Sequence, residues 1–308
     1  MQSSLRVNDF LLLIVVLTSM AVGIIFPGFS SHFQDMPIYC LMVLFLLSYL
    51  SVELKTVWST LKGDMWMILS FVILKSLILP VLVYYIFNLL FPSFALAALL
   101  LTGASTGVVA PFISNLVRGN SALVLVVAVV TSILVPVTLP ALIQVIAARH
   151  AEISLFAMTR MLLLVIFLPI LMVEGLRRLT PNLIQYMIKV RFPVSLIFFA
   201  IINLGVFCRY SVLFRTEPVI IIAASLVAVA LSVINCVVGI IFFLKAPVEN
   251  QLAGAVMMGN MNNVLIIVFS WTFFGSTEAL VAAMYIIPFF GLVVPLRYYA
   301  QRKVISAN

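Results

Sequence analysis

Two short polar stretches, each embedded in a long apolar segment, decide the fold expected for this chain. The first reads TGASTGVVAP at residues 102–111, and the second reads GAVMMGNMNN at residues 254–263. Glycine and proline weaken a helix, and within a bilayer a broken backbone is tolerated only where it is buried in protein or lines a water-filled cavity. Each stretch therefore predicts a membrane helix that is interrupted near its middle.

The rest of the chain has the composition of a membrane protein. Of its 308 residues, 65% are hydrophobic and 8% are charged, whereas a soluble domain carries roughly a quarter charged residues. So few charges cannot build a water-facing surface. This excludes a soluble enzyme and a disordered protein and, despite the net charge of +8, a nucleic-acid-binding protein. Since about 20 apolar residues cross a bilayer, the sequence predicts an all-α membrane protein with ten transmembrane helices. Their expected ranges are 10–27, 36–53, 65–90, 94–117, 121–147, 154–176, 192–208, 218–244, 251–273 and 279–296.

Lysine and arginine residues between the expected spans indicate the orientation. One side holds Arg6, Lys55, Lys62, Arg118, Arg177, Arg178, Lys189, Arg191, Lys245, Arg297, Arg302 and Lys303, and the other side holds Arg149, Arg209 and Arg215. Because basic residues near span ends resist translocation, we expect both termini in the cytoplasm and the chain in a plasma or inner membrane. The first span has no small-residue cleavage site and is not expected to be a signal peptide. The longest polar connection, residues 177–191, is expected to be an amphipathic surface stretch.

The two polar stretches occupy matching places in two halves of the chain. Residues 1–150 hold five expected spans, and residues 151–308 hold five that would enter from the opposite side. Interrupted segments at corresponding positions of an inverted repeat are the best sequence pointer to a transporter's binding site, and helix N-termini favour an anion. Asn260, Asn262 and Asn263 must face protein, water or ligand, because an unpaired amide is costly in lipid. The alternative is that the small residues only permit close helix packing.

Lys75 is the most informative single residue. It lies ten residues after the start of the third expected span at Met65, which is roughly 15 Å along a helix and near the bilayer centre. Every Asp and Glu falls in a connection or near a span end. A charge within a bilayer is expensive and indicates function by default. We therefore expect Lys75 to be neutral at rest, or charged and balanced by carbonyl groups or an anionic substrate. The alternative is a structural lysine that is hydrogen-bonded inside the protein.

These features together resemble the bile acid:sodium symporter family of organic-anion transporters. The resemblance rests on Leu54-Lys55 after the second span, LVRGN at 116–120, Pro80 after Lys75 and the polar break at 259–263. It implies ten helices in an inverted 5+5 repeat. Spans 1, 2, 6 and 7 would form a panel domain and spans 3–5 and 8–10 a core domain. Spans four and nine would cross at their breaks, with substrate bound between the domains.

The chain departs from the family at the positions that bind sodium. Aligned through the motifs above, the family's oxygen-bearing side chains are replaced in this sequence by Lys75, Ala110, Pro111, Val124, Ala128, Met257 and Met261, while Asn262 is kept. Apart from the lysine amine, none of these replacements is polar, so the usual sodium sites are expected to be absent. We interpret the Lys75 ammonium as standing in for a sodium ion, with coupling to protons if the amine titrates, or to no ion.

The function predicted from the sequence is secondary transport of a small or amphipathic organic anion by alternating access, without sodium. The expected substrate-binding residues are Ser105, Thr106, Gly107, Val108, Asn260, Asn262 and Asn263, with Lys75 as the ion substitute. No catalytic residue, metal site or cofactor is expected. The expected partners are the organic anion and the lipid bilayer, with no obligate protein partner.

Other functions fit parts of the sequence. A sodium-coupled symporter would need relocated ligands, for which Thr131, Ser132 and Asn260 are candidates. Arsenite and auxin-type carriers share the expected architecture, but arsenite carriers place a cysteine in the fourth span, and residues 102–117 contain none. An intramembrane enzyme needs His, Asp or Glu near the membrane face, and no DxxxD or HxxxD pair is present. A transport-dead sensor of the same fold is the remaining alternative.

Overall fold

The computed structural model describes residues 7–50, 52, 54–107, 109–146 and 154–305. Within these ranges the chain is helical, and their one β feature is an isolated bridge between Thr106 and Met261. The all-helical class predicted from the sequence is confirmed. Three residues singled out in the sequence, Arg6, Val108 and Arg149, lie outside the described residues.

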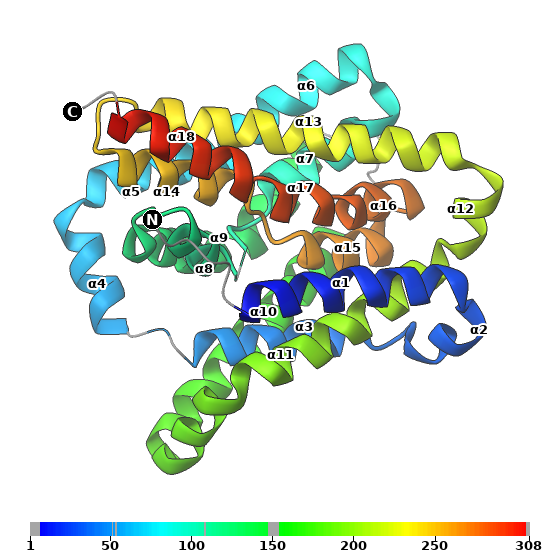
Figure 1. Ribbon diagram of the computed structural model, residues 1–308, viewed down its shortest axis with the longest axis horizontal. Helices are drawn as coiled ribbons and strands as arrows, with labels where there is room; N and C mark the ends of the chain where they lie inside the picture. The colour runs from blue at the N-terminus through cyan, green and yellow to red at the C-terminus, as the bar shows by residue number, and fades with distance from the viewer. Residues whose placement is uncertain (1–6, 51, 53, 108, 147–153, 306–308) are drawn as a thin grey trace. The chain divides into compact units, whose positions relative to one another are not determined.

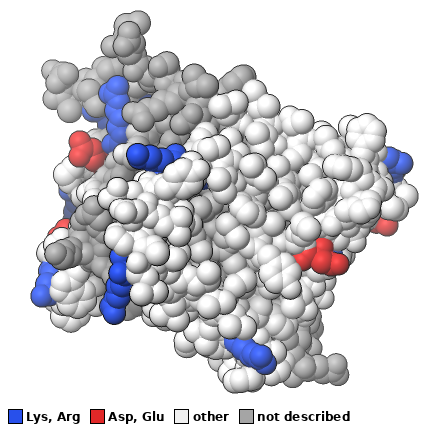
Figure 2. All heavy atoms as spheres, turned by 90° about the horizontal axis from the view of Figure 1, so that it is seen from below, with Lys and Arg blue, Asp and Glu red and all other residues white. Residues whose placement is uncertain are grey.

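Several of the helices are long and apolar enough to cross a membrane. Six qualify alone, and the pair Ile14–Ile25 and Pro27–Phe33, bent by 107°, makes a seventh. Large apolar side chains are exposed along them, with Trp66 81% and Leu89 82% exposed, and most of the surface visible in Figure 2 carries no charge. A surface of this kind suits lipid rather than water. The protein is therefore a multi-pass membrane protein. The six helices are Met65–Leu90, Ser121–Ile146, Leu155–Leu179, Pro181–Arg209, Pro218–Phe242 and Ser276–Lys303.

The chain divides into two compact units, of which the first comprises Met1–Ser51 and Leu164–Ile222. In this unit α11 packs along α1 and α3 (Figure 1), and Asn203 of α11 donates a hydrogen bond of 3.1 Å to the Ser19 hydroxyl of α1. A buried polar pair of this kind satisfies both groups inside an apolar bundle. The helices are α1 (Val7–Ile25), α2 (Pro27–Ser30), η1 (Ser31–Phe33), α3 (Pro37–Tyr49), α11 (Pro181–Arg209), α12 (Ser211–Thr216) and most of α10 (Leu155–Leu179).

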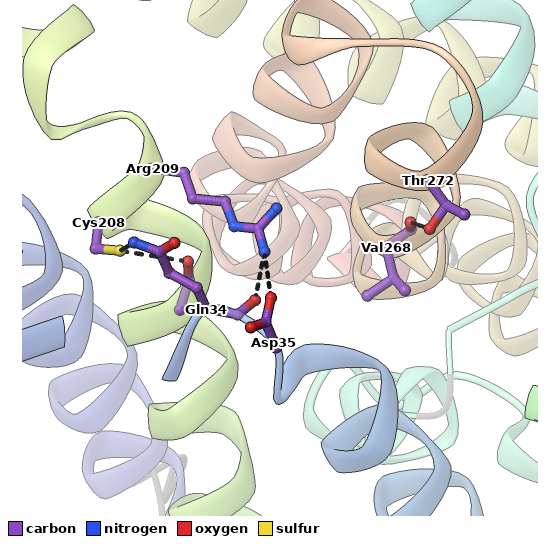
Figure 3. A network of polar contacts seen from close by, with 7 residues as sticks. Gln34, Asp35, Cys208, Arg209, Val268 and Thr272 are labelled. Carbon is purple, nitrogen blue, oxygen red and sulfur yellow. Dashed lines mark hydrogen bonds and ion pairs between the residues drawn. The ribbon is translucent and has the colours of Figure 1, made fainter. Parts of the chain in front are cut away.

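Two arginines of the first unit satisfy carbonyl groups at its helix ends and connections. Arg209 donates to the Gln34 carbonyl oxygen over 2.6 Å and to the Asp35 carboxylate over 3.3 Å (Figure 3). Arg177 donates to the carbonyl oxygen of Tyr49, the last residue of α3, over 3.1 Å. Because the last carbonyl groups of a helix have no partner within it, these bonds fix both ends of the segment that contains α3.

The second unit comprises Val52–Leu163 and Ala223–Asn308. Two hairpins organise it, since α6 packs along α7 and α15 packs along α16, and α7 also contacts α9 and α16. Its helices before residue 164 are α4 (Leu54–Gly63), α5 (Met65–Ile73), the π-helical turn η2 (Leu74–Ile78), α6 (Leu79–Leu90), η3 (Pro92–Phe94), α7 (Ala95–Gly103), α8 (Ala110–Leu116), α9 (Ser121–Ile146) and the start of α10. Those after residue 222 are most of α13 (Pro218–Phe242), α14 (Val248–Gly259), α15 (Asn263–Phe273), α16 (Ser276–Met284), α17 (Ile286–Gly291) and α18 (Val293–Ile305).

One expected boundary is wrong. Residues 177–191 form no long polar connection, because α10 continues to Leu179 and α11 already begins at Pro181, with Thr180 between them. Proline is favoured in the first turn of a helix and disfavours helical geometry at the residue before it. The polar residues after Pro181 include good helix formers such as lysine, arginine and glutamine. The polar residues after Pro181 therefore belong to the exposed first part of a 29-residue helix and not to a loop.

We expect Gly239→Ala to destabilise the protein. A Cβ at Gly239 would overlap the carbonyl oxygen of Gly254, and a Cβ at Gly254 would overlap that of Gly239, so α13 and α14 touch backbone to backbone. Overpacking costs about 1–3 kcal/mol, and the thermal unfolding temperature in detergent measures the loss. Gly175→Ala is the matched control, because a Cβ there meets nothing within 4 Å. Equal unfolding temperatures for the two variants would contradict the close packing.

Candidate functional site

The two polar stretches interrupt their helices, as predicted from their glycines and asparagines. α7 ends at Gly103 and α8 begins at Ala110, while α14 ends at Gly259 and α15 begins at Asn263. We call residues 104–109 the first break and residues 260–262 the second break. Each break lies between two helices of the second unit, and Val108 of the first break is outside the described residues.

The two breaks bind to each other through their backbones. The Gly107 amide donates to the Asn260 carbonyl oxygen over 2.7 Å, and the Asn262 amide donates to the Ser105 carbonyl oxygen over 2.9 Å. A Cβ at Gly107 would lie 3.0 Å from the carbonyl oxygens of both Asn260 and Met261. Glycine therefore favours the close approach of the two backbones here, and the breaks exchange hydrogen bonds that a bilayer cannot supply.

Thr106 ties the first break to its neighbours. Its hydroxyl donates to the Met257 carbonyl oxygen over 2.8 Å, and its amide donates to the Thr131 hydroxyl of α9 over 3.1 Å. Thr131 in turn donates to the Val127 carbonyl oxygen over 2.7 Å. The hydroxyl hydrogens of both threonines are therefore used inside the unit, which holds the first break against α14 and α9.

The three asparagines hold the second break in place. The side-chain amide of Asn260 donates to the Phe289 carbonyl oxygen over 2.9 Å, and that of Asn263 donates to the Ala282 carbonyl oxygen over 3.3 Å. The side-chain oxygen of Asn262 accepts from the Leu265 amide over 3.1 Å and so caps α15. Asparagine is among the preferred residues at this position of a helix.

Several buried polar atoms around the breaks have no hydrogen-bond partner among the described residues. Buried polar groups are nearly always paired, so an unpaired group indicates a place that a ligand or water completes. Ser105 and Asn262, which share a backbone hydrogen bond, each contribute one such atom. The atoms are Lys75 Nζ, Thr102 Oγ1, Ser105 Oγ, Asn260 Oδ1 and Asn262 Nδ2.

Lys75 lies at the level of the first break. It is fully buried in the π-helical turn η2, which packs against α7 and α9. A Cβ at Gly103, the last residue of α7, would lie 3.7 Å from Pro80 Cγ. α6 and α7 form a hairpin and run in opposite directions, so going backward along the chain from Pro80 leads the same way that α7 runs toward the first break. Lys75 lies five residues before Pro80, which is roughly 7 Å along a helix. Single π-helical turns are frequent at functional sites.

Apart from Asn262, the positions that the sequence resemblance aligns with sodium ligands carry no oxygen in their side chains. Ala110, Val124, Met257 and Met261 are each fully buried. Among the described residues, no group of three or more His, Cys, Asp and Glu side chains could hold a metal ion. Lys75 is the one charged side chain among the buried polar residues that the structure describes.

Tyr285 is a site residue that the sequence analysis missed. Its hydroxyl donates to the carbonyl oxygen of Gly259, the last residue of α14, over 2.7 Å, and its side chain is completely buried. The signal was a single phenol group in the middle of an apolar span, because a buried tyrosine hydroxyl usually has a partner. The bond fixes the edge of the second break to the last span.

We expect Tyr285→Phe to destabilise the second break. The change removes the hydroxyl and leaves the Gly259 carbonyl unpaired in a buried place, at a cost of about 1–3 kcal/mol. Thermal unfolding in detergent should show a lower midpoint than for Tyr85→Phe, the control, because Tyr85 is 59% exposed. If the two variants unfold at the same temperature, the Tyr285 hydroxyl does not stabilise the break.

No protein-family model matches the chain, and no curated protein sequence matches it.

Proposed function

We propose that this protein is a secondary transporter of an organic anion that works by alternating access without sodium, as a divergent relative of the bile acid:sodium symporters. The observation that carries the proposal is Lys75, a fully buried lysine whose ammonium nitrogen has no hydrogen-bond partner among the described residues. A buried charge is retained where it is paired or functional. An anionic substrate supplies the missing partner.

The proposed architecture is ten spans in an inverted 5+5 repeat, residues 1–150 and 151–308. In this proposal the six long helices and the bent pair of α1 with α2 account for seven spans. The shorter helix α3 and the broken pairs α7 with α8 and α14 with α15 would be the other three. The hydrogen bonds between the breaks support crossing of spans four and nine. The two compact units support a panel domain of spans 1, 2, 6 and 7 and a core domain of spans 3–5 and 8–10.

The proposed substrate site lies in the breaks. Ser105 and Asn262 contribute unpaired polar atoms, and Lys75 supplies the positive charge in place of a bound sodium ion. Thr106, Gly107, Asn260 and Asn263 shape the site through their hydrogen bonds within the unit. Val108, also expected from the sequence to bind substrate, lies outside the described residues. The absence of side-chain oxygen at Ala110, Val124, Met257 and Met261 supports a carrier that does not bind sodium at those positions.

We expect sodium to leave the stability of the purified protein unchanged. A ligand that binds only the folded state raises the unfolding temperature by mass action, so unfolding should be compared in sodium chloride and choline chloride from acid to alkaline pH. Equal unfolding temperatures in the two salts agree with the proposal that the Lys75 ammonium group takes the place of a sodium ion. A sodium-specific rise favours the second candidate function, a sodium-coupled symporter with relocated ligands. The specific observation behind that candidate is the unpaired Oδ1 of Asn260. The hydroxyl groups of Thr131 and Ser132 are its further candidate ligands.

A further inference from the structure

Among the described residues of the second unit, Lys75 is the one charged side chain that is buried. Between Asp64 and Arg118 the sequence contains no charged residue except Lys75. The helices packed against its turn are α5, α6, α7 and α9, and they carry no Asp, Glu, His, Lys or Arg. Their titratable side chains are Tyr84 and Tyr85 of α6, of which Tyr85 is exposed. No carboxylate on these neighbours competes for the ammonium group.

We propose that the site binds a monoanion with one carboxylate or sulfonate group and rejects dianions. This inference rests on the proposed function and names its substrate class. One ammonium group neutralises one negative charge, and a second charge would stay unpaired where the surroundings are apolar. An unpaired buried charge costs several kcal/mol. The substrate's single charge is thus set by the single lysine.

The unpaired polar atoms around the breaks fit an oxyanion. Ser105 Oγ, Thr102 Oγ1 and Asn262 Nδ2 are hydrogen-bond donors without partners among the described residues. A carboxylate has two oxygens with about four acceptor positions, and bonds from such donors to an ionised oxygen are roughly twice as strong as bonds between neutral groups. An amide of the same shape has one acceptor oxygen and no charge, so it loses the interaction with Lys75.

Thermal unfolding of the full-length protein in detergent, with three matched probes at equal concentration and neutral pH, tests the inference. The probes are hexanoate, its neutral counterpart hexanamide, and the dianion adipate. We expect hexanoate to raise the unfolding temperature and the other two to leave it unchanged. Lys75→Met, which keeps the length of the side chain without its charge, should lose the hexanoate shift completely, whereas Lys75→Arg should keep it.

Three results would overturn the inference. Adipate matching hexanoate in the wild type would show that the site accepts two charges, and hexanamide matching hexanoate would show that charge is not recognised. No shift with hexanoate would remove the substrate class that we assign. If Lys75→Met fails to fold, hexanoate and adipate are compared on Lys75→Arg instead. A shift with hexanoate but not with adipate then supports the inference, and equal shifts overturn it. Flux through reconstituted protein tests the transporter proposal separately, because binding in detergent does not depend on transport.

Discussion

Replacing Lys75 with glutamine should lower the rate of anion transport at least about 30-fold. Removing one partner of a buried charge pair costs about 2–5 kcal/mol, and each 1.4 kcal/mol is about a factor of ten. The measurement is the initial uptake of radiolabelled hexane-1-sulfonate and taurocholate into proteoliposomes that contain equal amounts of protein. Both probes remain monoanions over the whole working pH range, so any pH dependence comes from the protein.

The pH profile distinguishes a binding role for Lys75 from a purely structural one. If the ammonium form binds the anion, the wild-type rate falls as the pH rises, because deprotonation removes the positive charge. The Lys75→Gln rate should be low and independent of pH. Lys62→Gln is the control, since Lys62 lies at the end of α4 over the Trp58 ring and should transport at the wild-type rate. A Lys75→Gln protein with the wild-type rate and pH profile would exclude the proposed role.

The helix interruptions could be predicted from the sequence because their cause is local. Glycine, proline and asparagine weaken a helix, and their clustering at 102–111 and 254–263 predicted the ends of α7 and α14. The place of Lys75 within a long apolar helical segment followed from counting along the sequence. Its π-helical turn did not, because a π turn depends on how neighbouring helices pack and leaves no distinct sequence period.

The partners of the polar groups could not be predicted, because they come from distant segments. Asn260 and Asn263 were expected to meet protein, water or ligand, and the structure gives their amide groups carbonyl oxygens of Phe289 and Ala282. Asn262 differs from them, since it uses only its oxygen, as a helix cap, and keeps an unpaired amide nitrogen. The polarity of the sequence therefore indicated all three asparagines. Only the structure shows that Asn260 and Asn263 use their amide groups to bind carbonyl oxygens, whereas the amide nitrogen of Asn262 has no partner.

That difference makes Asn262→Asp the sharpest test of the break as an anion site. The aspartate keeps an oxygen for the Leu265 amide, and aspartate caps helices as well as asparagine does, so the protein should fold with an unchanged or higher unfolding temperature. The new carboxylate replaces the free amide nitrogen, repels an anion and offers Lys75 a permanent partner. Since like charges placed together cost several kcal/mol, uptake of hexane-1-sulfonate should fall at least about tenfold.

Asn262→Ser separates the effect of the charge from the effect of losing the amide. Serine caps a helix about as well as asparagine and adds no charge, so this variant should lose less transport than Asn262→Asp. The combination Asn262→Asp with Lys75→Gln should be less stable than Asn262→Asp alone, because it leaves the buried carboxylate without a counter-charge. Wild-type uptake by Asn262→Asp would show that the second break lies away from the anion. Equal stability of the single and double variants would show that Lys75 and residue 262 do not share one site.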